Sequence, residues 1–186
     1  MKELISAYTR DIKNLCDRLE SENLALAMQE FKAAYDRGSR ILVAGNGGSA
    51  ACVNHFYSDL GKNAVKHSPK RVKIISLSNS AEAITAIGND INVDSVFSEQ
   101  LVNLMEPGDL VLLVSASGNS PNILKAAQVA KEKCGRVVAF TGFAGGALKG
   151  MADICVNVES ESYEQIEDLH LMLTHMVVCY FKSLGL

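Results

Sequence analysis

Two short polar segments each follow an apolar run and precede a helical pattern. Residues 45–50 read GNGGSA, and residues 115–121 read SASGNSP. Glycines allow the backbone to approach an anion closely, and the N-terminus of a following helix offers free N–H groups and a favourable dipole. The second segment adds three hydroxyl groups, with Pro121 suited to the first turn of the next helix. Both segments favour a phosphate that is bound by hydrogen bonds rather than by lysines, although such turns also occur for purely structural reasons.

Titratable side chains are spaced for metal binding on two predicted helices. His55 and Asp59 lie four residues apart, which places them on one face of the helix that follows the glycine segment. The last helical pattern carries Glu167, Asp168, His170 and His175. Two imidazoles and two carboxylates, from His55, Asp59, Glu167 and His175, suit Zn²⁺ or a similar divalent ion. For each histidine taken alone, a hydrogen-bonded interior or interface position is the alternative.

Alternating strand and helix patterns position these residues. Short β-branched runs at 40–44, 71–77, 109–115, 136–140 and 153–158 are typical of strands buried on both faces. Helical patterns lie between them at 48–65, 80–88, 93–104, 120–133 and 146–150, and a long helix is predicted over 163–184. This alternation predicts an α/β fold with a doubly wound, flavodoxin-like parallel sheet, whose ligands lie at the carboxyl ends of the strands.

Residues 1–186 are predicted to form a single domain. Two amphipathic patterns at 2–19 and 21–36 predict an N-terminal helical hairpin over 1–37, ahead of an α/β core and C-terminal helix over 38–186. No strand precedes these helices, so their apolar faces need another surface. A second copy of the chain is a natural one.

Composition excludes several classes of protein. The 186 residues are 48% hydrophobic and 21% charged, with a net charge of −3 and no Trp, which argues against nucleic acid as a ligand. No signal peptide and no membrane span are predicted. Five cysteines without a C-x-x-C pair are typical of a reduced, cytoplasmic protein.

Nucleotide binding is a weaker interpretation of the glycine segment. Gly45, Gly47 and Ala50 match a dinucleotide fingerprint, but the second predicted strand ends without the acidic residue that holds a ribose. The nearest acid, Glu82, falls within the next predicted helix. A Walker loop also fails, because no Lys-Ser/Thr follows the glycines.

Taken together, four motifs resemble the sugar isomerase (SIS) domain. They are the two polar segments, His55-Phe56 and Gly88-Asn89-Asp90, and within that family their order and spacing look most like the phosphoheptose isomerases. The resemblance covers almost the whole chain. It implies a five-stranded parallel sheet flanked by helices and a homotetramer with active sites at subunit interfaces.

The resemblance also implies roles for individual residues. Those expected to face the sugar phosphate are Asn46, Gly47, Gly48, Ser49, Asp59, Asn89, Asp90 and Glu167. Those expected to cradle the phosphate are Ser115, Ala116, Ser117 and Ser120. One Zn²⁺ or similar ion per subunit would be held by His55, Asp59, Glu167 and His175, with Asp59 and His175 as catalytic acid and base in an order left open. Asn89 and Asp90 have an alternative role, which is to cap the helix after them.

The chain departs from the family pattern at several of these positions. Asp59 stands where the family has glutamate, and Glu167 where it has glutamine. Ala116 replaces a usual threonine, which removes one hydroxyl group. An arginine that the family often places after the metal-binding glutamate is missing, with Lys62 or Asn63 in that region. We interpret Asp59 and Glu167 as linked changes, tuned to a related aldose–ketose phosphate.

The implied reaction is aldose–ketose isomerisation, with sedoheptulose 7-phosphate converted through an enediol to glycero-manno-heptose 7-phosphate for glycan synthesis. The alternative is a non-catalytic SIS protein that binds sugar phosphates as a regulator or scaffold, as in partners of replication initiators. The acid at Asp59 together with His55 and His175 favours the enzyme.

Restoring the family residues tests the linkage. We expect Asp59→Glu with Glu167→Gln to raise turnover of the heptose phosphate, because a displacement of about 1 Å in a reacting group can cost roughly 10²-fold in rate. Steady-state kinetics of the double variant and both single variants measure this. Unchanged kinetics would contradict the linkage.

Overall fold

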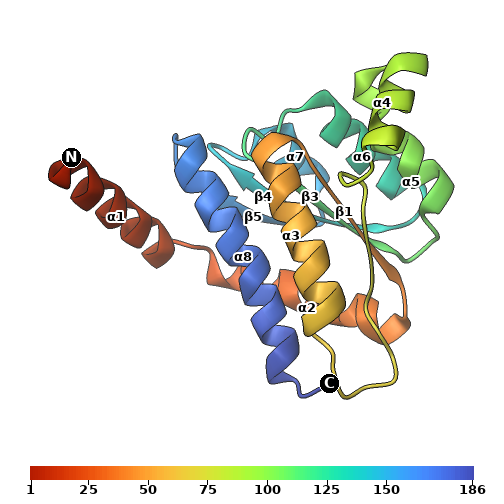
Figure 1. Cartoon of the computed structure of the whole chain (residues 1–186), viewed down its shortest axis with the longest axis horizontal. Coiled ribbons are helices and arrows are strands. Elements are labelled where there is room, and N and C mark those ends of the chain that lie inside the picture. Colours follow the sequence, from red (N-terminus) through yellow and green to blue (C-terminus); the bar gives the residue numbers. More distant parts are fainter.

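The chain folds as a five-stranded parallel sheet between two layers of helices (Figure 1). The computed structural model describes residues 1–186, apart from the side chain of Asn63. The strands are β1 (Arg40–Gly45), β2 (Lys73–Ser76), β3 (Leu110–Ser115), β4 (Arg136–Gly142) and β5 (Ile154–Val158). Their order in the sheet is β2-β1-β3-β4-β5, with all neighbours parallel. The predicted doubly wound, flavodoxin-like sheet is therefore confirmed.

Helices connect the strands and follow the predicted ranges closely. They are α1 (Lys2–Asp17), α2 (Ser21–Arg37), α3 (Gly47–Asn63), α4 (Ala81–Asp90), α5 (Ser98–Leu104), α6 (Pro121–Glu132), α7 (Gly146–Met151) and α8 (Tyr163–Ser183). A 3₁₀ turn, η1 (Val93–Ser95), precedes α5, so the single helix predicted over 93–104 is divided in two. No helix within the described residues is long and apolar enough to cross a membrane.

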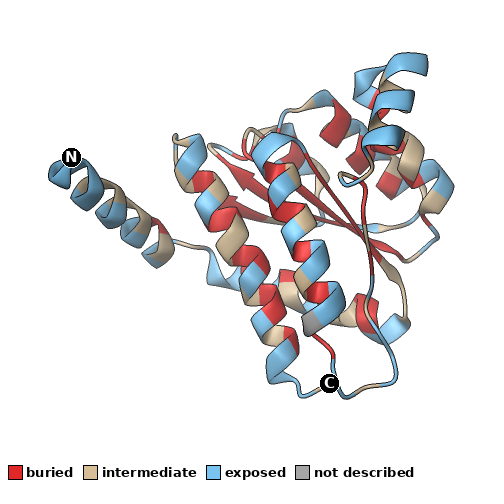
Figure 2. Cartoon of the chain, viewed as in Figure 1, coloured by how far each residue is buried: buried red, intermediate tan, exposed pale blue. Residues whose placement is uncertain are grey.

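Alternation along each strand divides the core into two parts. On β1, Ile41 and Val43 pack with α2, α3 and α8, while Leu42 and Ala44 pack with α5, α6 and α7. Figure 2 shows the resulting buried sheet, with the buried faces of α3 and α8 turned toward it. Because both faces of the strands are covered, their apolar runs are continuous rather than alternating with polar residues.

The N-terminal helices do not form a compact pair. α2 packs against the sheet, whereas α1 extends away from the domain (Figure 1). Only the C-terminal part of α1 reaches the core, through Leu15. A hydrogen bond of 2.6 Å from the Tyr8 hydroxyl to Asp168 ties α1 to α8 and raises the pKa of Tyr8 to about 12.

His170 is fully buried between α8 and β4. Its Nε2 lies 3.0 Å from the Thr141 carbonyl oxygen, whereas its Nδ1 has no hydrogen-bond partner within the described residues. Burial lowers the pKa of His170 to about 4. This histidine therefore belongs to the interior, and it is neutral at physiological pH.

We expect His170 to make the fold sensitive to mild acid. The unfolded chain takes up a proton at His170 below about pH 6.5, but the native chain does so only near pH 4, so stability falls as the pH drops between these values. The free energy of unfolding should decrease by roughly 3 kcal/mol through this group. Urea unfolding at several pH values measures it.

His170→Gln should flatten this part of the pH profile. The matched control is His67→Gln, because His67 is exposed and should leave the profile unchanged. An identical pH dependence in His170→Gln and the wild type would contradict the assignment.

Candidate active site

The two polar segments meet between β1 and β3, where the order of the strands in the sheet reverses. β1 and β3 are neighbours, and the loop after each leads into a helix, α3 and α6 respectively. In a doubly wound sheet this position is where ligands bind. The N–H groups of Gly47, Gly48 and Ser49 precede the first intrahelical bond of α3, which runs from Ala50 N–H to the Asn46 carbonyl.

Both segments line a cavity of about 220 Å³, which we call the serine cavity. It is lined by Asn46, Gly47, Gly48, Ser49, Val114, Ser115, Ala116, Ser117, Ser120, Tyr163 and Glu167. All the residues expected to cradle a phosphate are thus together in one cavity. The lining offers hydroxyl and backbone N–H donors but no lysine or arginine, and Glu167 is its only charged side chain.

The β4–α7 loop and the first turn of α7 contact the second polar segment. Gly118 has φ +61°, and a Cβ there would lie 2.0 Å from the carbonyl oxygen of Gly145. The Gly118 carbonyl accepts from Leu148 N–H at 3.0 Å, and the Asn119 side chain accepts from Ala147 N–H at 2.9 Å. Glycine at 118 is therefore required by this close approach as well as by its backbone conformation.

Asn46 is held by a partner that the sequence analysis did not identify. Its amide exchanges two hydrogen bonds with the buried amide of Asn122, at 2.9 and 3.0 Å. This pair joins the N-terminal ends of α3 and α6. The position of Asn122, directly after Pro121 in the second segment, was the available signal, but its pairing with Asn46 depends on tertiary contact.

A second, larger cavity of about 620 Å³ lies on the other side of Asn46. It includes Asn46, Gly47, Asn89 and Asn122, with apolar residues of α4 and η1. Asn89 and Asp90 form the exposed last turn of α4, where Asn89 Nδ2 donates to Asp90 Oδ1 at 2.8 Å. They do not cap η1, whose N-cap is Asn92, so of their two predicted roles the capping one is wrong.

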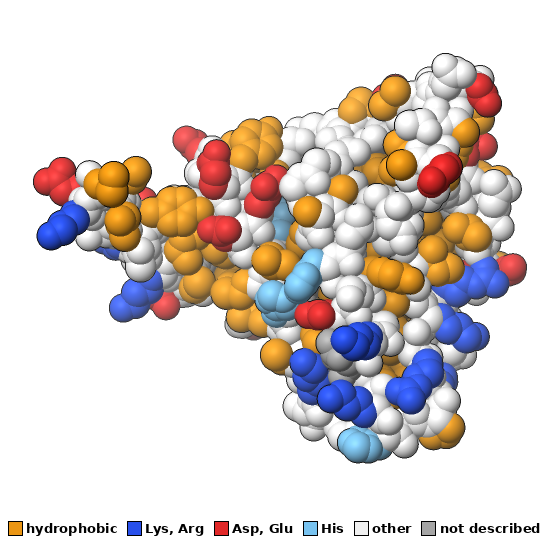
Figure 3. Space-filling model, viewed as in Figure 1, with side chains coloured by type: hydrophobic (Ala, Val, Ile, Leu, Met, Phe, Trp, Pro, Cys, Tyr) orange, Lys and Arg blue, Asp and Glu red, His pale blue; other side chains and the backbone are white. Residues whose placement is uncertain are grey.

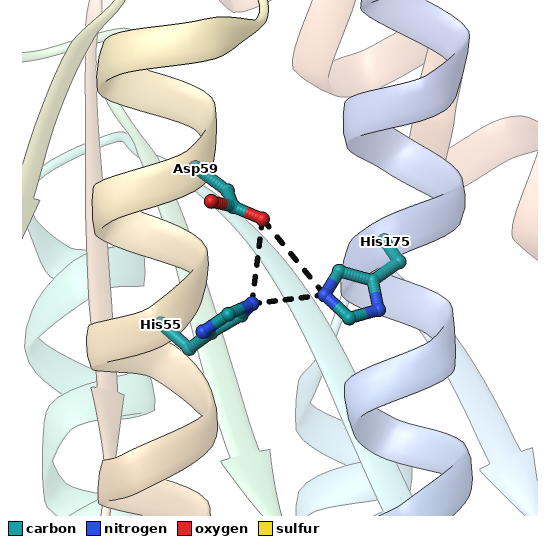
Figure 4. Close-up of side chains that lie close together, drawn as sticks. All are labelled: His55, Asp59 and His175. Carbon is teal, nitrogen blue, oxygen red and sulfur yellow. Dashed lines mark hydrogen bonds and ion pairs between the residues drawn. The ribbon is translucent and has the colours of Figure 1, made fainter.

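Three of the four predicted metal ligands converge between α3 and α8 (Figure 4). His55 Nε2 lies 2.9 Å from His175 Nε2, and Asp59 Oδ2 lies 3.3 Å from His55 Nε2 and 3.8 Å from His175 Nε2. Ligand atoms about 2.1 Å from a tetrahedral ion are about 3.4 Å apart, so this spacing fits a metal such as zinc. Three protein ligands also leave a fourth position open for water or substrate.

Glu167 lies apart from this His55/Asp59/His175 cluster. Its carboxylate is seated over Gly48, where an added Cβ would be 2.3 Å from Oε2. Glu167 and Gly48 also line a further cavity of about 390 Å³ that includes Cys52 and His55. Glu167 therefore lies where the serine cavity and the cavity beside His55 meet, and not among the clustered ligands.

Cys52 lies beside His55 in the cavity of about 390 Å³ but is not suited to metal binding. Burial raises the pKa of the Cys52 thiol to about 11, so Cys52 is neutral at physiological pH and is a poor metal ligand. Lys62, in the region of the missing arginine, lines a separate groove with Tyr57 and Ile74. Asn63, the other residue of that region, lies outside the described side chains.

The cluster predicts binding of one divalent transition-metal ion. We expect Co²⁺ to bind with a visible absorption band typical of few-coordinate nitrogen and oxygen ligation, and His175→Ala to weaken binding at least tenfold because one of three ligands is lost. His67→Ala serves as the control. Equal Co²⁺ affinity in His175→Ala and the wild type would show that the cluster does not hold the ion.

Comparisons with known proteins agree with this architecture. The family model described as "SIS domain" matches residues 7–142. A probable phosphoheptose isomerase of Thermoplasma acidophilum is 38% identical over 86% of this chain and 87% of its own length, and a phosphoheptose isomerase of Shewanella oneidensis is 34% identical over 94% and 91%. The structure of a phosphoheptose isomerase from Neisseria gonorrhoeae superposes with a TM-score of 0.90 at 29% identity, covering 98% of both chains. Together with the five-stranded parallel sheet and its two polar loops, these matches show that the chain belongs to the SIS domain family.

Proposed function

We propose that this protein is a phosphoheptose isomerase, which converts sedoheptulose 7-phosphate to glycero-manno-heptose 7-phosphate. The observation that carries the proposal is that Gly48 and Glu167 line both the serine cavity and the cavity of about 390 Å³ that includes His55 of the His55/Asp59/His175 cluster. A phosphate site next to a proton-transfer or metal site suits a sugar phosphate. The relatives of high coverage that carry the name phosphoheptose isomerase support this substrate class.

Binding begins with the phosphate. The serine cavity is lined by Ser115, Ser117 and Ser120, which carry hydroxyl groups, and by the first residues of α3, whose backbone N–H groups have no intrahelical partner. Hydrogen bonds to charged oxygens are about twice as strong as those between neutral groups, so these neutral donors favour phosphate binding despite the Glu167 carboxylate in the same lining. The sugar chain then extends past Glu167, while Asn46 offers its remaining amide donor and acceptor.

Isomerisation requires two proton movements. A base removes a proton from the hydroxyl-bearing carbon next to the carbonyl, which forms an enediol, and the proton is returned to the former carbonyl carbon while the hydroxyl proton moves between the two oxygens. Asp59 and His175 are our candidates for these roles, in an order left open. Their side chains are partly exposed on facing helices, so both are accessible to substrate.

The same cluster would hold one Zn²⁺ ion per subunit through His55, Asp59 and His175. An ion held by these residues would supply Lewis-acid polarisation of the substrate carbonyl. Glu167 is the fourth ligand that the family resemblance implies, and its carboxylate would have to leave Gly48 to join the cluster. In its present position over Gly48, the Glu167 carboxylate adds a negative charge to the serine cavity.

Assembly into a homotetramer, with active sites between subunits, is part of the proposal. Support comes from α1, which extends from the domain with Met1, Leu4 and Ile5 largely exposed. Figure 3 shows hydrophobic side chains gathered on this helix. Such faces are normally buried against a partner.

A cytoplasmic location is also proposed, because all five cysteines are free.

Proton NMR of sedoheptulose 7-phosphate in D₂O, with and without added Zn²⁺, tests the function. We expect aldose signals and deuterium incorporation with the wild type. His175→Ala should abolish both, while His67→Ala, at an exposed loop position, should retain them.

The other outcomes separate the alternatives. Line broadening of the substrate without exchange would contradict catalysis on this sugar and favour a sugar-phosphate-binding regulator. Neither exchange nor broadening would favour a scaffold protein with the SIS fold.

A further inference from the structure

Tyr163 is an additional side chain at the rim of the serine cavity. It is the first residue of α8 and lines the cavity with the serines of the second segment, yet 53% of its surface is exposed. Tyr163 and Glu167 are four residues apart, so the first turns of α8 present both side chains to the same cavity. This helical spacing from Glu167 was the sequence signal that could have identified Tyr163.

The backbone and the ring of Tyr163 each have a local contact that limits their movement. At the start of α8, the Ser162 side chain accepts from Gln165 N–H at 3.4 Å and so caps the helix that carries Tyr163. The ring itself packs edge-on against Phe143, with centroids 5.0 Å apart and planes at 67°. The ring is therefore positioned before any ligand arrives, which reduces the entropy lost on binding.

Phe143 adopts an unusual backbone conformation at this contact. Its φ is +48°, which bulky side chains rarely adopt. Its N–H donates to the Ser160 carbonyl at 3.1 Å, and its carbonyl accepts from Asn157 Nδ2 at 3.0 Å. Backbone strain of this kind persists where surrounding contacts enforce it, and it gathers at ligand sites.

The chemistry of the cavity leaves a role for the Tyr163 hydroxyl. The cavity lining has no cation, and Glu167 adds a negative charge, so a bound phosphate depends on neutral donors alone. No hydrogen bond of the Tyr163 hydroxyl is found among the described residues. A phenol is a donor and acceptor of the same kind as the serine hydroxyls, but on a longer and more rigid side chain.

We propose that Tyr163 is a phosphate-binding residue that donates its phenol hydroxyl to the phosphate of the bound sugar, while its ring covers the mouth of the serine cavity. The inference rests on the proposed function, because it assumes that this cavity receives the phosphate. It adds a residue beyond the two polar segments, and it makes selection for phosphorylated over unphosphorylated sugars depend on the start of α8.

Calorimetric titration with inorganic phosphate tests the hydroxyl directly, without turnover. We expect Tyr163→Phe to raise the Kd for phosphate about ten- to a hundredfold, as for loss of a hydrogen bond to a charged group. Tyr57→Phe is the matched control, because Tyr57 is 40% exposed in a separate groove. Since Tyr163 is exposed, thermal unfolding of Tyr163→Phe should match that of the wild type.

Two further measurements complete the test. Ser117→Ala reports whether phosphate occupies the serine cavity, and isomerase kinetics of Tyr163→Phe should show a KM for the sugar phosphate raised by a similar factor with kcat within about twofold of the wild type. If Ser117→Ala weakens phosphate binding and Tyr163→Phe does not, the inference about Tyr163 is overturned while the proposed function stands. If the wild type binds no phosphate, or neither variant weakens binding, the phosphate site in the serine cavity and the inference both fail.

Discussion

The close approach of α8 to α3 is the contact on which the rest of the site depends. These helices lie side by side on one face of the sheet (Figure 1), and Gly48 allows the Glu167 carboxylate to rest directly on the first turn of α3. Further along the same pair of helices, the approach brings His55 and Asp59 within 3.8 Å of His175. A larger side chain at position 48 would have to displace Glu167, so the helix pairing and the placement of the charges are linked.

The sheet contributes the other half of the site. Because β1 and β3 are neighbours and run parallel, the loops that follow them meet at one edge, each at the start of a helix. The Asn46–Asn122 pair then joins the two helix ends, which limits how far the two polar segments can separate. The serine cavity is therefore built from backbone N–H groups and short serine side chains. The sheet sets their positions more closely than it could set those of long, flexible side chains.

Charge distribution distinguishes this site from one that uses lysine or arginine to bind phosphate. No lysine or arginine lines the serine cavity, whereas Glu167 places one carboxylate in its lining and Asp59 places another in the His55/Asp59/His175 cluster. Repulsion between these carboxylates and a sugar phosphate would oppose binding unless a divalent ion offset it. Under the proposed function, metal binding at the His55/Asp59/His175 cluster and phosphate binding in the serine cavity would therefore be coupled through electrostatics as well as through geometry.

Local patterns in the sequence were sufficient to predict the fold. Every strand and helix of the α/β core was predicted, because strands buried on both faces have continuous β-branched runs and surface helices have amphipathic spacing. Motif spacing also identified the two polar segments and the pair His55 and Asp59, since residues four apart in a helix must share a face.

Contacts between distant segments could not be predicted from these local patterns. Three such contacts depend on how separate elements pack. They are the hydrogen bonds between Asn46 and Asn122, the position of Glu167 over Gly48 rather than in the cluster, and the contact of Tyr163 with Phe143. Local spacing determines which face of an element a residue occupies, but only tertiary packing determines what that face meets.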